Sequence, residues 1–316
     1  MKTLKLAFVG MGSIGKRHLN NVRSYLDSQG TPYLIDLFRS GQGTILAPKI
    51  EQVVHKIYYL SEYQTAPDTY DAVFITNPTS MHYDTIKYFA NSARAMFIEK
   101  PVLDRTDLKI DNLKISENTI CYVACPLRYH PVIDYVYKNI SCHKAYAVRA
   151  ICSSYLPDWR PVIDYRKCYS ARRDMGGGVG IDLIHEWDYL SYLFGAVKYG
   201  TCIQNKISDL ELDSDDIAVY IARTSHTVIE LHLDYFGRSP LRQFQIFMPD
   251  ETIECDILNG KIFFLKAKHI LSFDCDRDTY QRNEIMHFFD ILNEKCPNDN
   301  DISCALRTLS YAKGEF

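Results

Sequence analysis

The stretch Leu4-Lys5-Leu6-Ala7-Phe8-Val9-Gly10-Met11-Gly12-Ser13-Ile14-Gly15-Lys16-Arg17-His18 decides how the chain begins to fold. An apolar run leads straight into three glycines, and a segment with helical spacing follows. Here Gly10 permits a tight turn, Gly12 lets the backbone approach a pyrophosphate, and Gly15 lets the helix pack closely on the strand. The phosphates would lie on the free N–H groups at the positive end of the helix, which begins near Ser13 and Ile14. We therefore expect a dinucleotide-binding strand, turn and helix.

Length and composition limit what else the chain can be. Its 316 residues are enough for two domains, each with its own core. Hydrophobic residues make up 47% and charged residues 24%, as in ordinary soluble globular proteins. The net charge of −3 offers no field to attract nucleic acid or an anionic membrane, and no apolar run is long enough to span a bilayer. We expect neither nucleic acid nor a membrane as partner.

The ten cysteines are scattered along the chain without a CxxC pair. No spacing of cysteine and histidine matches a zinc site, so we expect no metal. Buried, reduced thiols are typical of a protein in a reducing compartment, and the expected location is cytoplasmic.

The first 124 residues alternate between apolar strands and helices, which predicts a Rossmann domain over 1–124: a doubly wound parallel sheet of the α/β class. The expected strands after the first are 33–38, 56–60, 71–76, 95–98 and 121–124, and the expected helices are 16–29 and 83–91. Ligands of such sheets bind beyond the carboxyl ends of the strands. We therefore expect two loops to face the cofactor, one with Thr76, Asn77, Pro78 and His82 and one with Glu99 and Lys100.

The end of the second strand selects between cofactors. An acid there binds the ribose 2′-hydroxyl, whereas an arginine accommodates a 2′-phosphate. This strand ends at Arg39 and Ser40, with Asp36 inside it, which favours NADP over NAD. The alternative is that Arg39 is only a solvated loop charge.

From Cys125 onward the pattern changes. Alternating segments and the turn Asn259-Gly260 predict a second domain over 125–316, of the α+β class with a large, mostly antiparallel open sheet. The expected strands are 144–154, 201–207, 216–224, 226–234, 242–248, 252–258 and 261–265. Two last helices, 279–293 and 302–313, could pack back on the first domain. The acidic run 209–216 is expected to be a solvated turn.

Four stretches together resemble one family. FVGMGSIGKRH, ITNPTSMH, FIEKP and Met175-Gly176-Gly177-Gly178-Val179-Gly180-Ile181-Asp182-Leu183-Ile184-His185-Glu186-Trp187-Asp188 are similar, in this order, to the Gfo/Idh/MocA oxidoreductases. Glucose–fructose oxidoreductase and inositol dehydrogenase belong to this family. The resemblance implies reversible hydride transfer between a secondary alcohol carbon and C4 of a nicotinamide. It also implies a homodimer or homotetramer that pairs the open faces of the second-domain sheets.

Lys100, Asp182 and His185 are the expected catalytic residues. Lys100 follows an apolar strand, so partial burial would pull its pKa down toward the range useful for proton transfer, and its bond to Pro101 is a candidate for the cis form. Asp182, His185 and Asp188 are spaced by three and would share one face of a helix. Either Lys100 or His185 would take the hydroxyl proton. The family places its histidine four residues after the aspartate, so the division of work among these residues stays open. The alternative is a capping carboxylate and a core histidine.

A segment rich in aromatic and arginine residues is the expected substrate-binding part of the second domain. Aromatic faces stack on sugar rings, and arginines bind carboxylates or phosphates. Besides Lys100, Asp182 and His185, the candidates are Arg128, Tyr155, Trp159, Arg160, Tyr165 and Arg166. This resembles the family branch found with bacterial surface-sugar and nucleotide-sugar pathways, and it predicts a sugar, a sugar derivative or a nucleotide sugar as substrate. Three alternatives stay open: a merely stabilising loop, a non-catalytic cofactor-binding regulator of the same fold, and a reductase of a non-sugar carbonyl or imine.

Overall fold

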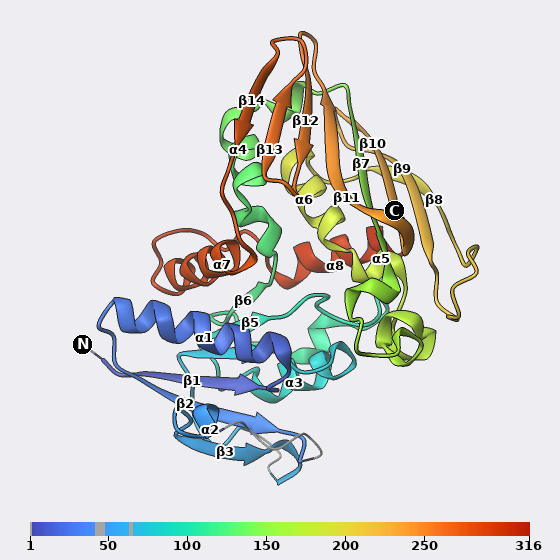
Figure 1. Cartoon of the computed structure of the whole chain (residues 1–316). Helices are drawn as coiled ribbons and strands as arrows, with labels where there is room; N and C mark the ends of the chain where they lie inside the picture. Colours follow the sequence, from blue (N-terminus) through green and yellow to red (C-terminus); the bar gives the residue numbers. More distant parts are fainter. Residues whose placement is uncertain (1, 42–47, 63–65) are drawn as a thin grey trace. The chain divides into compact units, whose positions relative to one another are not determined.

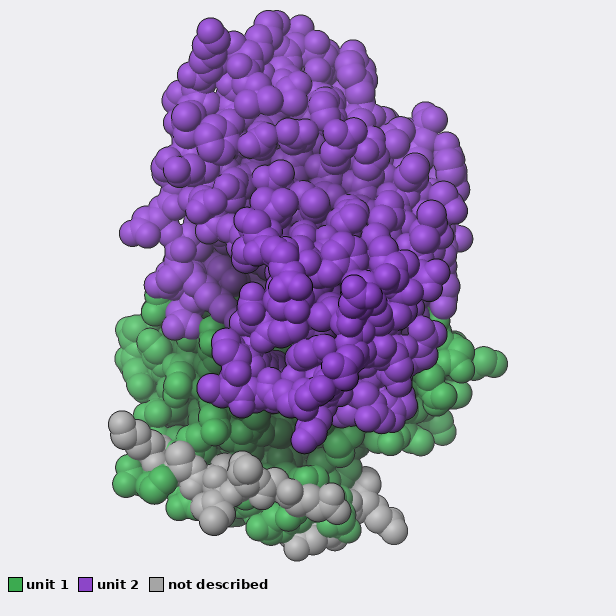
Figure 2. Space-filling view, turned by 45° about the vertical axis from the view of Figure 1, so that its right-hand side comes forward, with its two compact units in different colours: residues 1–124, 281–306 green, residues 125–280, 307–316 purple. Residues whose placement is uncertain are grey.

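A computed structural model describes residues 2–41, 48–62 and 66–316 of the chain (Figure 1). The chain divides into two compact units (Figure 2). Unit 1 comprises residues 1–124 and 281–306, and unit 2 comprises residues 125–280 and 307–316. The chain therefore leaves unit 1 after residue 124, returns to it at residue 281 and ends in unit 2.

Unit 1 is built on a parallel sheet of six strands in the order β3-β2-β1-β4-β5-β6. The strands are β1 (Leu4–Val9), β2 (Tyr33–Arg39), β3 (Lys56–Tyr59), β4 (Ala72–Ile75), β5 (Ala95–Ile98) and β6 (Ile120–Val123). Every residue of β4 and β5 is buried, as expected where helices cover both faces of a parallel sheet. The strand order reverses between β1 and β4, and ligands of doubly wound sheets bind at this switch point. The predicted Rossmann fold is confirmed.

The helices of unit 1 include parts of two from the far end of the sequence. They are α1 (Ser13–Ser28), α2 (Pro48–Glu51), α3 (His82–Phe89), the part of α7 (Arg277–Leu292) from residue 281 onward and the part of α8 (Ile302–Ala312) up to residue 306. The connection from β5 to β6 forms only a short 3-10 helix, Ile110–Leu113. Phe288 of α7 packs against the rings of Phe97 and Tyr122, at 5.4 and 6.0 Å between ring centroids. Helix α7 thus covers the part of the sheet that this connection leaves without an α-helix.

Unit 2 contains an eight-stranded sheet in the order β14-β13-β12-β11-β7-β10-β9-β8. Its strands are β7 (Ala147–Tyr155), β8 (Tyr199–Asn205), β9 (Ile217–Arg223), β10 (Val228–Asp234), β11 (Phe236–Phe247), β12 (Thr252–Asp256), β13 (Lys261–Phe264) and β14 (His269–Ser272). Its helices are α4 (Pro131–Asn139), α5 (Val179–Asp182), α6 (His185–Phe194) and the last part of α8 (Ile302–Ala312). Only β7 and β10 pair in parallel, so the predicted, mostly antiparallel sheet is confirmed. The sequence analysis missed β14, an edge strand whose side chains are mostly exposed.

The two faces of the unit 2 sheet differ in burial. In β9, Ala218, Tyr220 and Ala222 are buried, and Trp187 of α6 packs on Tyr220 with ring centroids 5.2 Å apart. On the opposite face, Ile221 is 55% exposed and Ile203 of β8 is 68% exposed. One face of the sheet is therefore covered by helices, whereas the other presents apolar side chains to solvent.

Candidate cofactor and substrate residues

The glycine turn joins β1 to α1 in unit 1. Gly10 has φ +86°, and a Cβ there would lie 2.9 Å from the backbone of Asn77, so only glycine fits. A Cβ at Gly15 would lie 2.6 Å from Thr76 Oγ1, which is the close packing that the sequence predicted. At Gly12 the space is open, because no atom of the described residues beyond its two chain neighbours lies within 4 Å of an added Cβ, and Gly12 gives α1 no side-chain cap. Open space in front of uncapped N–H groups at a helix start is what a pyrophosphate requires.

The loop after β4 is tied to the glycine turn and to the loop after β5. Thr76 Oγ1 donates to the carbonyl oxygens of Val9 and Gly10, at 3.0 and 3.1 Å. His82 is buried; its Nε2 faces the Asn77 carbonyl at 3.0 Å, and its Nδ1 faces the carbonyls of Pro101 and Val102 at 3.1 Å each. Both ring nitrogens of His82 thus contact backbone carbonyls, and the side chain connects the loop after β4 to the loop after β5. Pro78 is exposed beside them.

Glu99 and Lys100 end β5, and the Lys100–Pro101 bond is cis, as the sequence suggested. The carboxylate of Glu99 accepts the backbone N–H of Lys100 at 3.2 Å and contacts Nε2 of His18 at 2.5 Å. Burial alone would raise the pKa of the Glu99 carboxyl, but the His18 hydrogen bond and the charges of His18 and Lys100 outweigh burial and lower it. Glu99 is therefore an ionised acceptor.

Asp36 cannot serve as the acid that binds a ribose. It is fully buried within β2, where it accepts from Tyr70 Oη at 3.0 Å and contacts His55 Nδ1 at 3.2 Å. Arg39 is the last residue of β2 and is partly exposed, and the exposed Ser40 follows it. The carboxyl end of this strand therefore presents a cation and a hydroxyl.

In unit 2, the structure corrects the single helix that was predicted to carry Asp182, His185 and Asp188. Asp182 ends α5 and His185 begins α6, with a turn between them. The N–H of Ile184 bonds to the carbonyl of Ile181, and that of Glu186 to the carbonyl of Leu183, both three residues back. Such tightened turns eclipse side chains at i and i+3, so a spacing of three suits this backbone.

The carboxylate of Asp182 is held by tyrosines. Tyr235, between β10 and β11, donates its hydroxyl to Asp182 Oδ2 at 2.6 Å, and both residues are buried. The pKa of Tyr169 is raised, first by burial and then by the charge and hydrogen bond of Asp182, while the charge of Arg160 lowers it. Trp159 packs edge-on against Tyr235 at 5.4 Å. The structure thus brings together four predicted or adjoining residues, Trp159, Arg160, Tyr169 and Asp182, and adds Tyr235, which the sequence analysis missed.

Arg128 and Asp188 serve the core of unit 2. The Arg128 guanidinium binds Asp188 through two hydrogen bonds, of 2.6 and 3.0 Å, and both side chains are buried. Arg128 also lies over the ring of Tyr192, at 4.6 Å from its centroid. These contacts occupy Nε, one amino group and one face of the guanidinium, so the structure assigns Arg128 a role in the core of unit 2.

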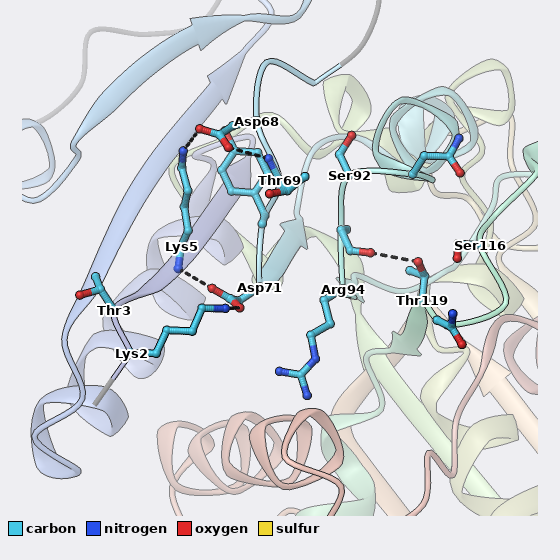
Figure 3. A pocket seen from close by; sticks show the side chains of 14 residues that line it. Lys2, Thr3, Lys5, Asp68, Thr69, Asp71, Ser92, Arg94, Ser116 and Thr119 are labelled. Atoms are coloured by element: carbon cyan, nitrogen blue, oxygen red, sulfur yellow. Dashed lines mark hydrogen bonds and ion pairs between the residues drawn. The ribbon is translucent and has the colours of Figure 1, made fainter.

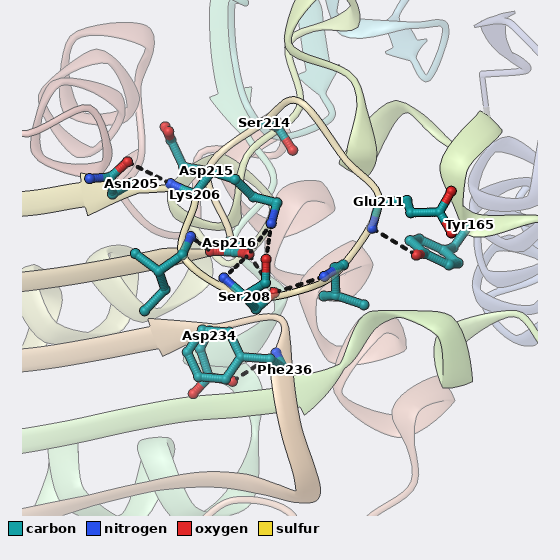
Figure 4. Close-up of polar contacts among 12 residues, drawn as sticks. Tyr165, Asn205, Lys206, Ser208, Glu211, Ser214, Asp215, Asp216, Asp234 and Phe236 are labelled. Carbon is teal, nitrogen blue, oxygen red and sulfur yellow. Dashed lines mark hydrogen bonds and ion pairs between the residues drawn. The ribbon is translucent and has the colours of Figure 1, made fainter.

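Residues 209–216 form the predicted turn between β8 and β9, in which Asp209, Glu211 and Asp213 are exposed but Asp216 is not (Figure 4). Asp216 is fully buried and accepts the N–H groups of Ile207 and Ser208 at 2.8 and 3.0 Å. The backbone N–H of Glu211 donates to Tyr165 Oη at 3.0 Å, and its carboxylate pairs with Arg166, which also binds Asp164. The hydroxyl of Tyr165 and the guanidinium of Arg166 thus bind groups within unit 2. Tyr155 lies under the guanidinium of Arg238, at 3.7 Å.

A groove of about 580 Å³ lies at the opposite edge of the unit 1 sheet, at the amino ends of the strands (Figure 3). Its charged side chains are largely paired with one another: Lys2 with Asp71 at 2.7 Å, and Lys5 with Asp68. Because ligands of parallel sheets bind at the carboxyl ends, this groove is not the cofactor site.

Within residues 2–41, 48–62 and 66–316, every helix is too short or too polar to cross a membrane. Over the same ranges, histidine, cysteine, aspartate and glutamate side chains form no group of three that could hold a metal ion.

Comparison with known proteins places this geometry in a family. Residues 4–116 match the family described as "Oxidoreductase family, NAD-binding Rossmann fold", GFO_IDH_MocA. The chain is 27% identical over 197 residues to inositol 2-dehydrogenase of Rhizobium meliloti, an alignment that covers 61% of this chain and 56% of that protein. Residues 4–116 are thus similar to the NAD-binding part of the Gfo/Idh/MocA oxidoreductases. The matched residues lie in unit 1 and carry five strands of its parallel Rossmann sheet, β1 to β5.

Other members extend the comparison. The scyllo-inositol 2-dehydrogenase (NAD(+)) of Bacillus subtilis is 27% identical over 241 residues, which are 69% of this chain and 63% of that protein. The chain thus spans less than two thirds of the length of either inositol dehydrogenase. Among solved structures, UDP-N-acetylglucosamine 3-dehydrogenase GnnA from Acidithiobacillus ferrooxidans covers 99% of this chain and 96% of its own, with a TM-score of 0.73 and 20% identity. The WlbA dehydrogenase from Bordetella pertussis, in complex with NADH and UDP-GlcNAcA, has a TM-score of 0.76 at 15% identity, with 99% of this chain and 95% of that chain covered. Both structures share the fold.

Proposed function

We propose that this chain is an NAD(P)-dependent dehydrogenase that transfers hydride between the nicotinamide and a secondary alcohol or ketone carbon of a sugar, sugar derivative or nucleotide sugar. One observation carries the proposal: the glycine turn, the Asn77 loop and the Glu99-Lys100 loop follow three neighbouring strands, β1, β4 and β5, at the switch point of the sheet. The substrate class is supported by the family and by relatives named for inositol and UDP-N-acetylglucosamine.

The dinucleotide supplies the hydride chemistry when it is bound, and the protein supplies orientation and proton transfer. Lys100 or His185 takes the proton of the substrate hydroxyl as hydride leaves. Asp182 already accepts the Tyr235 hydroxyl at 2.6 Å, so we assign it to orienting the substrate. Because Asp188 is bound to Arg128, it takes no part in the chemistry.

A screen of nicotinamide absorbance with NAD⁺ and NADP⁺ tests the proposal against polyols, sugars and nucleotide sugars. Lys100→Ala should abolish turnover while dinucleotide binding, followed by fluorescence titration, persists. Unchanged turnover in this variant would refute the assigned role of Lys100. Intact dinucleotide binding without turnover of any of these substrates would favour a cofactor-binding regulator.

We propose NADP as the preferred cofactor. Arg39 and Ser40 at the end of β2 suit a 2′-phosphate, and the only acid of this strand, Asp36, is buried and bound to Tyr70. The similarity to the scyllo-inositol 2-dehydrogenase (NAD(+)) of Bacillus subtilis favours NAD instead. Arg39→Ala should raise the KM for NADP⁺ about tenfold or more, the cost of losing one charged contact, and leave that for NAD⁺ unchanged. An equal effect on both cofactors would refute the assignment.

Arg160 is the arginine of the substrate segment that we propose to bind a carboxylate or phosphate of the substrate. It is exposed and acts on Tyr169, which also contacts Asp182, whereas Arg166 is paired with Asp164 and Glu211. Arg160→Ala should raise the KM for an anionic nucleotide sugar and leave that for a neutral polyol unchanged. Arg166→Ala is the matched control, because its guanidinium is already occupied.

We also propose that the chain forms a homodimer or homotetramer through the exposed face of the unit 2 sheet. That face carries Ile203 and Ile221 around the ion pair of Arg149 and Glu230, whose side chains are 2.9 Å apart. Ile221→Glu should shift the sedimentation velocity profile toward monomer.

The proposed location is the cytoplasm, whose reducing conditions suit the ten cysteines, five of them buried.

A further inference from the structure

His18 has a role that its place in the glycine motif does not explain. It lies in α1, is only 1% exposed, and packs edge-on against Phe97 at 4.9 Å. Its Nε2 lies 2.5 Å from Glu99 Oε1, across 81 residues of sequence. Because Glu99 is an ionised acceptor, the His18 proton in this contact sits on Nε2. A buried, charge-assisted hydrogen bond therefore joins the helix of the glycine turn to the end of β5.

The same carboxylate also holds the backbone of Lys100. Glu99 Oε2 accepts the N–H of Lys100 at 3.2 Å, while Oε1 binds His18. One oxygen thus faces α1 and the other faces the proposed proton acceptor. A displacement of α1 is passed through two hydrogen bonds to the backbone of Lys100.

A second histidine fixes the far side of this loop. His82 contacts the carbonyls of Pro101 and Val102, which follow Lys100, and the carbonyl of Asn77. Its partners lie on the loops after β4 and β5, and none of them is on α1. Among these contacts, only that of His18 connects the Lys100 loop to α1. The first turn of α1 is the part suited to the pyrophosphate.

We propose that His18 is a positioning residue that links dinucleotide binding at the start of α1 to the placement of Lys100. The inference rests on the proposed dehydrogenase function. A phosphate bound to the first turn of α1 fixes that helix, and the His18–Glu99 bond carries this constraint to Lys100. The amine of Lys100 then meets the substrate hydroxyl in one orientation, and a misplacement of about 1 Å in such a group can cost on the order of 100-fold in rate.

Two substitutions separate the hydrogen bond from the packing. His18→Leu keeps most of the buried volume and removes the donor, whereas His18→Gln keeps an N–H donor on a side chain of similar reach. His18→Leu should lower kcat about 10- to 100-fold, leave KM for the substrate within about twofold, and shift the pH profile of kcat. His18→Gln should restore most of the rate. His55→Leu is the matched control, because His55 also pairs with a carboxylate of unit 1, Asp36, at 3.2 Å.

Labelling of Lys100 gives a readout that needs no turnover. An amine-reactive reagent is applied over a pH series with and without NADPH, and the labelled Lys100 peptide is quantified by mass spectrometry. In the wild type, NADPH should change the labelling of Lys100; in His18→Leu, NADPH should still bind but no longer change the labelling.

The proposal is refuted if His18→Leu keeps wild-type kcat and labelling. It is also refuted if His18→Gln restores neither kcat nor labelling while both variants lose the same thermal stability. If the wild type turns over none of the substrates but binds NADPH, the labelling alone decides the link, and only the proposed function fails.

Discussion

Gly12→Ala separates cofactor binding from folding more cleanly than any other change to the glycine turn. Gly12 has φ −70° and ψ −168°, which alanine adopts, and beyond its two chain neighbours no described atom lies within 4 Å of the added Cβ. Replacing glycine by alanine at such a position restricts the unfolded chain and so stabilises the folded protein by about 0.4–1 kcal/mol. Alanine is a poorer N-cap than glycine by about 0.5–1 kcal/mol. These effects offset each other, so the free energy of unfolding should stay within about 1 kcal/mol of the wild type.

Cofactor affinity should respond differently. The methyl group would occupy the open space in which a pyrophosphate meets the N–H groups of α1, and it would break at least one hydrogen bond to a charged group. Such a bond is worth about 1.5–3 kcal/mol, so the Kd for the dinucleotide should rise about 10- to 100-fold. The assays are urea unfolding, followed by circular dichroism, and NADPH fluorescence titration.

Gly15→Ala is the contrasting variant. Its Cβ would lie 2.6 Å from Thr76 Oγ1 and 2.8 Å from the Gly10 carbonyl oxygen. Overpacking at this position costs about 1–3 kcal/mol of stability. The higher helix propensity of alanine offsets up to about 1 kcal/mol of that cost, so we expect a net loss of about 1–2 kcal/mol. The reasoning about the turn would be refuted if Gly12→Ala bound NADPH with wild-type affinity, or if it lost more stability than Gly15→Ala.

Three further predictions concern the groups that hold the site residues. Arg128→Met should cost about 3–5 kcal/mol of stability, because it leaves the buried Asp188 carboxylate without its partner. Arg166→Ala, at an exposed pair, should cost much less, and equal losses in urea unfolding would contradict this. The pKa of Glu99 is lowered from 4.5 on folding, so its contribution to stability is complete above pH 4.5 and is lost as the pH falls through the folded value. Glu99→Gln should therefore flatten the fall of the unfolding free energy below pH 4.5, and a curve parallel to the wild type would disprove it. Phe288→Ala should destabilise unit 1 by about 3–5 kcal/mol, since this fully buried ring packs on three rings of the sheet, and a thermal midpoint within about 2 °C of the wild type would rule that out.

The fold was predictable because its signals are local. Buried strands such as 95–98 are continuous apolar runs, the helices show a period near 3.6, and the glycine turn has a fixed geometry between them. Where a signal was weak, the prediction failed: β14 is a short, mostly exposed edge strand without a clear alternation. The split between Asp182 and His185 was missed because hydrophobic periodicity does not distinguish one helix from two that meet at a tightened turn.

The site was less predictable, because it depends on which partner each charged group finds. Arg128 and Asp188 are 60 residues apart, and nothing in their local sequence indicates that they pair. His18 could have been found in part. It falls on the buried stripe of α1 with Gly15, Leu19 and Val22, and a histidine on such a stripe needs a polar partner. Its partner, Glu99, could not be read from spacing.

The residues after His185 explain how the start of α6 is held. Helix α6 begins at His185, and the next two acidic residues, Glu186 and Asp188, lie in its first turn, where the helix dipole favours negative charge. Glu186 binds Arg242 at 2.6 Å, and Asp188 binds Arg128 at 2.6 Å; both carboxylates are buried. A buried pair contributes little net stability over apolar packing, but breaking it is costly, so the two pairs fix the start of α6 in one position. The acids after His185 therefore anchor the start of the helix that carries it.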